Sequence, residues 1–112
     1  MSKTLTFAFA GLRHPHGWAI WNRVQMERAC EAVAVCEEHA PTRDELLARP
    51  DISHVYDSYS EMLNAVESRV VATADYYGNR GRIAIGALED GRHVLADKPI
   101  CASLADLERI AA

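Results

Sequence analysis

The chain has 112 residues, of which 49% are hydrophobic and 25% charged, a composition that predicts one folded globular domain and excludes a disordered chain. Its net charge of -4 comes from scattered charges, so neither a nucleic acid nor an anionic membrane surface is an expected partner. No apolar run approaches the roughly 18 to 20 residues that cross a bilayer, and no signal peptide opens the chain, so we expect a cytoplasmic protein.

The amino-terminal half of the sequence contains two strand-helix units. Thr4 to Ala10 is an apolar run of strand length that ends at Gly11. Apolar residues at helical spacing then predict a helix over 18–29. A second apolar run, Glu31 to Glu37, predicts a buried strand. The next helix opens at Ala40-Pro41-Thr42 and stops before Pro50.

The second half continues this alternation with shorter elements. They are a strand over Ser53–Tyr56, a helix over Ser60–Ala65 capped by Ser58 or Ser60, a strand over Arg69–Ala74, a helix over Arg80–Glu89 closed by Gly91, a strand over His93–Ala96 and a last helix capped by Ser103. Alternating strands and helices with short connections predict an α/β fold. We expect a doubly wound, mostly parallel sheet of about five strands, with helices on both faces, in a single domain over 1–112.

Three cysteines, Cys30, Cys36 and Cys101, form an odd set without a C-x-x-C spacing. This pattern is typical of reduced thiols rather than of a disulfide framework or a zinc site. We interpret all three as buried or half-buried packing residues. Reduced thiols are consistent with the expected cytoplasmic location.

The segment from Gly11 to Gly17, with the sequence G-L-R-H-P-H-G, links the first strand to the first helix. Such a connection aims unpaired backbone N–H groups and the positive end of the helix dipole at the carboxyl edge of the sheet, where a phosphate binds. Arg13 and His16 stand where a G-x-G-x-x-G fingerprint has its second and third glycines. The segment therefore falls short of that fingerprint. Because Arg13 lies just before the first helix, it is a candidate to pair with a phosphate oxygen.

The two histidines of this segment have alternative interpretations. His14 and His16 line a pyrophosphate or the substrate edge, or else His14 shapes the turn with Pro15 while His16 packs beside Trp18. An H-x-H pair also resembles part of a metal site, but no further ligand lies at a defined spacing. No metal site is therefore predicted.

Two charged groups follow later strands. Glu37 lies 20 residues after Gly17, where a carboxylate accepts hydrogen bonds from the ribose of a dinucleotide and disfavours the 2′-phosphate of NADP. The alternative is that Glu37 and Glu38 are solvated loop residues. Asp97-Lys98-Pro99 follows the strand over His93–Ala96, and an ammonium there can bind a substrate hydroxyl or carboxylate and help to move a proton. The alternative is an ordinary surface pair.

Residues 87–100, A-L-E-D-G-R-H-V-L-A-D-K-P-I, resemble the stretch A-L-x-x-G-K-H-V-L-x-E-K-P of the glucose-fructose oxidoreductase / inositol dehydrogenase / MocA (Gfo/Idh/MocA) family. Residues 32–37 resemble the family's second strand with its terminal acid. Residues 59–63 resemble the neighbourhood of the family's Y-x-x-x-x-x-L pattern, before the fourth strand. Asp97 replaces the glutamate of E-K-P, Asp75-Tyr76-Tyr77 replaces T-P-N, and Arg80 stands where many members carry histidine. The resemblance covers nearly all of the chain, but only the family's amino-terminal domain.

The resemblance implies a Rossmann-type domain that binds NAD, with NADP less favoured. Lys98 matches the E-K-P lysine, which contacts the nicotinamide end and the substrate, and is the expected catalytic residue. The expected cofactor-binding residues are Gly11, Leu12, Arg13, His14, Gly17, Glu37, Thr73, Ala74, Asp97 and Lys98.

Family members also carry a carboxy-terminal domain with substrate contacts, a second catalytic group and the dimer interface. We expect that domain to be absent from this chain, which therefore is the nucleotide-binding part of an oxidoreductase for a sugar, polyol or related hydroxy compound, catalytically incomplete alone. Its uncovered apolar face predicts a homo-oligomer. The alternative function is a non-catalytic binding or assembly module that has lost tight cofactor binding.

Overall fold

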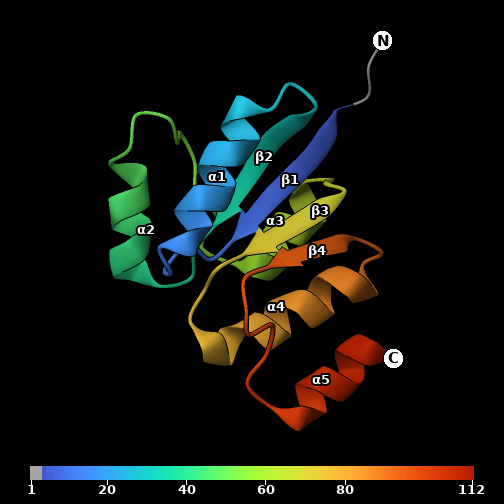
Figure 1. The fold of residues 1–112 in the computed structure, drawn as a ribbon. Helices are drawn as coiled ribbons and strands as arrows, with labels where there is room; N and C mark the ends of the chain where they lie inside the picture. The colour runs from blue at the N-terminus through green and yellow to red at the C-terminus, as the bar shows by residue number, and fades with distance from the viewer. Residues whose placement is uncertain (1–3) are drawn as a thin grey trace.

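A sheet of four parallel strands forms the centre of the molecule. The computed structural model describes residues 4–112. Its strands are β1 (Leu5–Ala10), β2 (Cys30–Cys36), β3 (Val70–Thr73) and β4 (His93–Ala96), in the spatial order β2-β1-β3-β4 (Figure 1). All three strand pairs are parallel. The chain thus winds outward from β1 in both directions, which confirms the doubly wound α/β fold and puts the switch point beside β1.

The predicted strand over Ser53–Tyr56 is where the sheet differs from expectation. Tyr56 makes an isolated bridge to Cys36, with hydrogen bonds from Tyr56 N to the Val35 carbonyl (2.8 Å) and from Glu37 N to the Tyr56 carbonyl (2.9 Å). Ser53 and His54 are exposed, and Ser58 already caps the next helix. Too few residues remain for a longer ladder, so the sheet has four strands rather than about five.

Helices cover both faces of the sheet, as the alternation predicts. Helices α1 (His16–Met26) and α2 (Ala40–Leu47) lie on one face, and α3 (Tyr59–Ala65) and α4 (Tyr77–Glu89) on the other (Figure 1). Successive strand residues point to opposite faces, so β1 supplies both cores. Phe7 and Phe9 pack with α1, while Ala8 and Ala10 pack with α3 and α4. In the described part of the chain, no helix has the length and apolar character needed to span a bilayer.

The ends of the helices follow the predicted capping residues. Ser58 accepts a hydrogen bond from Glu61 N at the start of α3, and Ser103 accepts one from Asp106 N at the start of α5 (Leu104–Ala111). Gly91 follows α4 with a φ of +78°. α4 begins at Tyr77 rather than at the predicted Arg80. Its first turn forms early because the Asp75 carboxylate accepts hydrogen bonds from Tyr76 N and Asn79 Nδ2.

Candidate functional site

The carboxyl ends of all four strands are tied together by backbone contacts. Gly11 N donates to the Cys36 carbonyl at the end of β2, and Ala74 N donates to the Gly11 carbonyl, each at 3.0 Å. Asp97 N donates to the carbonyl of Thr73, at the end of β3 (3.4 Å). The structure therefore brings the ten predicted cofactor-binding residues to one edge of the sheet.

Gly11 and Gly17 let the β1-α1 loop press against the end of β3. Gly11 has a φ of +83°, and a Cβ added to it would lie 2.5 Å from Asp75 Cβ. At Gly17 an added Cβ would lie 2.8 Å from Leu12 Cδ2 and 2.9 Å from Ala74 Cβ. Leu12 and Ala74 are buried. These predicted cofactor residues thus shape the floor of the site by close packing.

Glu37 is buried beneath the loop, with 1% of its surface exposed, which excludes the solvated alternative for this residue. Its carboxylate accepts hydrogen bonds from Leu12 N (3.0 Å) and His39 N (3.2 Å). Burial raises the pKa of Glu37 against the opposing effect of these hydrogen bonds. The carboxylate therefore fastens the β1-α1 loop to the end of β2. Its neighbour Glu38 is exposed.

Two adjoining hollows lie along this edge and share Arg13 and Tyr76. The first, of about 230 Å³, is lined by Arg13, Glu38, His39, Asp75, Tyr76 and Asn79. The second, of about 190 Å³, is lined by Arg13, His14, Tyr76 and Tyr77. In the two residues that they share, the Arg13 guanidinium carbon lies 4.7 Å from the centre of the Tyr76 ring. We call the two hollows together the edge pocket.

The edge pocket also contains three residues that were not predicted as site residues: Glu38, His39 and Asn79. Their positions in the sequence could have predicted them. Each lies shortly after a parallel strand, and residues in such positions face the crevice at the sheet edge. Arg13, which was predicted, is exposed and contributes a cation to both parts of the edge pocket.

Arg80 is completely buried and holds the Asp97-Lys98-Pro99 turn. Its Nε donates to the Asp75 carbonyl (2.6 Å), and its Nη1 donates to the carbonyls of Asp97 (3.0 Å), Lys98 (2.9 Å) and Pro99 (3.3 Å). This role was not predicted. The spacing of Arg80 from Ile83, Ala84 and Ala87 could have indicated it, because that spacing places the arginine on the buried face of α4.

The turn that Arg80 holds carries the predicted catalytic lysine. Lys98 is exposed, and the Lys98–Pro99 peptide bond is cis. Among residues 4–112, the buried side-chain polar atoms without a hydrogen-bond partner are Thr73 Oγ1 and Arg80 Nη2. Thr73 ends β3, and Arg80 lies beneath the turn that follows β4. Both unpaired atoms thus belong to the sheet edge where the predicted site lies.

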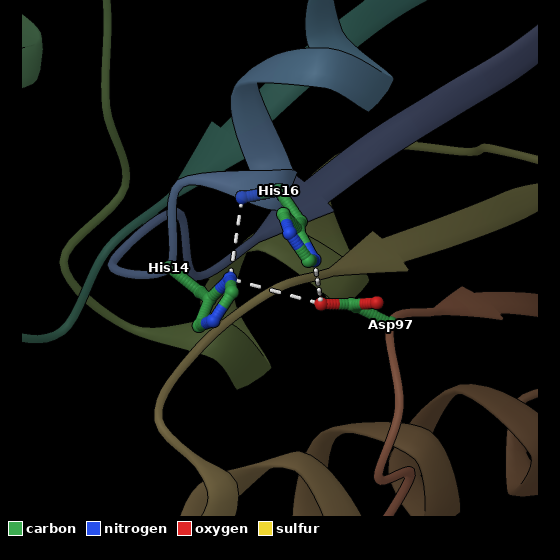
Figure 2. A group of neighbouring side chains, drawn as sticks. All are labelled: His14, His16 and Asp97. Atoms are coloured by element: carbon green, nitrogen blue, oxygen red, sulfur yellow. Dashed lines mark hydrogen bonds and ion pairs between the residues drawn. The ribbon is translucent and has the colours of Figure 1, made fainter.

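His14, His16 and Asp97 form a second cluster at the same edge (Figure 2). His16 Nδ1 lies 2.7 Å and His14 Nδ1 3.7 Å from Asp97 Oδ2. The hydrogen bond with His16 is the main cause that lowers the pKa of Asp97. The sequence offered two histidines without a third ligand, and the fold places Asp97, 81 residues after His16, beside them.

Comparison with known proteins gives one sequence match at the family level and many structural ones. The sequence model of an oxidoreductase family with an NAD-binding Rossmann fold, Gfo/Idh/MocA, matches residues 6–112. No match was found among the sequences of curated proteins.

Among solved structures, the WlbA dehydrogenase from Bordetella pertussis, in complex with NADH and UDP-GlcNAcA, is 22% identical with a TM-score of 0.81, over 97% of this chain and 32% of that one. The apo scyllo-inositol dehydrogenase from Lactobacillus casei is 18% identical with a TM-score of 0.82, over 99% of this chain and 33% of that one. An NAD-binding protein from Listeria innocua is 25% identical with a TM-score of 0.79, over 97% of this chain and 32% of that one. The chain thus spans about a third of the length of these structures.

Proposed function

The chain belongs to the Gfo/Idh/MocA family of oxidoreductases as an NAD-binding Rossmann domain, and we propose that it serves an enzyme acting on a sugar, a polyol or a related hydroxy compound. The observation that carries the proposal is the edge pocket, which is lined by Arg13 and His14 of the β1-α1 loop and by residues that follow β2 and β3. His14 Nδ1 lies 3.7 Å from Asp97 Oδ2, in the turn that bears Lys98. Two structurally similar proteins, named as acting on an inositol or bound to a sugar nucleotide, support this substrate class.

The residues around the edge pocket fit a dinucleotide. NAD accepts a hydride, or supplies one in its reduced form, when it is bound, and the protein has to hold and orient the cofactor. Arg13, at the positive end of the α1 dipole, presents positive charge to a pyrophosphate. Glu38 puts an exposed carboxylate into the lining of the edge pocket at the end of β2, with Glu37 buried beneath the loop, and a carboxylate there disfavours the 2′-phosphate of NADP. The unpaired Thr73 Oγ1 lies at the same edge.

We assign Lys98 the catalytic role, at the nicotinamide end of the site. The turn sets its backbone, because Arg80 binds the carbonyls of Asp97, Lys98 and Pro99, while its ammonium stays exposed. An ammonium held this way can bind a substrate hydroxyl and help to move its proton. Hydride transfer also needs the substrate held in near-attack geometry. We propose that a further domain supplies those contacts, so these 112 residues alone bind cofactor without turnover.

Titration of NADH, followed by its fluorescence, tests cofactor binding. We expect a saturable signal, with NADPH binding more weakly. Arg13→Ala should weaken NADH binding about tenfold or more, because a hydrogen bond to a charged group is worth roughly 1.5–3 kcal/mol. Arg23→Ala is the matched control, since Arg23 is an exposed arginine of α1 that pairs with Glu27. Equal affinities of the two variants would contradict the assignment of Arg13.

The second candidate function is a non-catalytic binding or assembly module with this fold. The observation that favours it is the loop itself, in which Arg13 and His16 replace two glycines that let a dinucleotide approach the backbone. A flat NADH titration of the folded protein would support this module and refute the cofactor-binding function. A saturable titration would do the reverse.

Self-association and a cytoplasmic location complete the proposal. Leu95 on the edge strand β4 and Leu104 and Leu107 on α5 have 43%, 77% and 46% of their surface exposed. We expect these leucines to be covered in a homo-oligomer, and light scattering should show that the double variant Leu104→Glu/Leu107→Glu becomes monomeric. A wild-type monomer at working concentration would contradict this. The three cysteines are unpaired, which supports a reducing compartment.

A further inference from the structure

We propose that His14, His16 and Asp97 form a binding site for a divalent transition-metal ion of the zinc class. The two histidines come from the start of α1 and the loop before it, and Asp97 from the turn after β4. Their side chains point toward one another (Figure 2). One ligand atom from each residue can be chosen so that all three atoms lie within 4.8 Å of one another.

The donor set is the one that such an ion takes. Two imidazole nitrogens and one carboxylate oxygen are zinc ligands, at about 2.0–2.2 Å from the metal. Ligand atoms around a tetrahedral ion are therefore about 3.4 Å apart. The separations of 2.7 Å and 3.7 Å from Asp97 Oδ2 bracket that value, and all three ligand atoms lie within 4.8 Å of one another. Rotation of the side chains would bring the three atoms to tetrahedral spacing. Three protein ligands leave a further position for water or a substrate oxygen.

The backbone around the three ligands is already fixed. His14 N donates to the Ala74 carbonyl (2.8 Å), and Asp97 N donates to the carbonyl of the adjacent Thr73 (3.4 Å). The Asp97 carbonyl accepts from Arg80 Nη1 (3.0 Å). Both ligand-bearing segments are thus tied to the end of β3, and metal binding requires little ordering of the chain.

The ligands are also accessible. The side chains of His14, His16 and Asp97 are 29%, 66% and 19% exposed, so an ion can enter from solvent. The competing interpretation is a bare histidine-aspartate ion pair, which at a surface is worth at most about 1 kcal/mol. In that pair only His16 lies at hydrogen-bond distance from Asp97. His14 Nδ1 instead accepts a hydrogen bond from His16 N (3.2 Å), which an ion bound at this nitrogen would replace.

Calorimetric titration of the full chain with zinc chloride, in the absence of NADH, tests the proposal. We expect one zinc ion per chain. His14→Ala, His16→Ala and Asp97→Asn should each weaken zinc binding at least tenfold. His93→Ala should leave it unchanged, because His93 is exposed at the opposite end of β4. Binding without this pattern, or no binding, would overturn the site.

Two further measurements keep the result interpretable. Circular dichroism checks that each variant is folded, and Asp97→Asn preserves the shape of the side chain. In the wild type, cobalt(II) should give visible d–d bands without thiolate charge-transfer bands, which a site on the nearby Cys101 would show. Charge-transfer bands, or loss of binding in Cys101→Ser, would also overturn the proposal. Since no NADH is present, these outcomes are independent of the proposed cofactor function.

Discussion

Substitution of Arg80 by methionine is expected to lower the free energy of unfolding by about 3–5 kcal/mol. The guanidinium donates to four carbonyls, from Asp75, Asp97, Lys98 and Pro99, and is fully buried. Methionine keeps much of the apolar stem but leaves those carbonyls without a donor. Removing the charge also removes its desolvation cost, so the loss stays below the sum of four broken hydrogen bonds.

Urea denaturation measures this loss, and Arg109→Met is its control. Arg109 pairs with Glu89 on the surface, with 62% of its side chain exposed, so its replacement should change stability by no more than about 0.5 kcal/mol. If the free energy of unfolding of the Arg80 variant stays within about 1 kcal/mol of the wild-type value, the four carbonyls have found other donors, and the turn does not depend on Arg80.

Substitution of Gly11 by alanine should cost about 2–5 kcal/mol of stability and abolish NADH binding. Gly11 has a φ of +83°, which an alanine adopts only with strain. The new Cβ would also lie 2.5 Å from Asp75 Cβ. The backbone cannot easily move away, since Gly11 N is bonded to Cys36 and its carbonyl to Ala74. The loop that carries Arg13 must therefore be displaced.

Gly91→Ala separates backbone strain from this clash. Gly91 has a nearly equal φ of +78°, and nothing lies within 4 Å of an added Cβ. The Gly91→Ala substitution should lower the free energy of unfolding by only about 1–2 kcal/mol. It should leave NADH affinity unchanged, because Gly91 lies at the end of the sheet away from the edge pocket. Urea denaturation and NADH titration of both variants measure the difference. Equal effects of the two substitutions would show that contact with Asp75 is unimportant.

The differences between the predicted and observed elements have local causes. The strand over Ser53–Tyr56 was predicted from a short run, but only Tyr56 pairs with β2 before Ser58 starts α3. The start of α4 was placed at Arg80 because the polar segment before it resembles a loop. The Asp75 carboxylate instead receives the N–H of Tyr76 and the amide of Asn79, and the helix begins at Tyr77. Side-chain contacts of this kind are not visible in hydrophobic periodicity.

The sequence by itself determined the alternation of strands and helices, the glycine turn at Gly11 and the family, because these depend on short-range patterns and one long motif around Lys98. Only the tertiary structure decided that Glu37 is buried under the loop, that Arg80 holds the turn of Lys98, and that Asp97 joins the two histidines. These contacts join residues 17 to 83 positions apart in the chain. Parallel strands make them possible, because they bring their carboxyl ends to one edge whatever the distance along the chain.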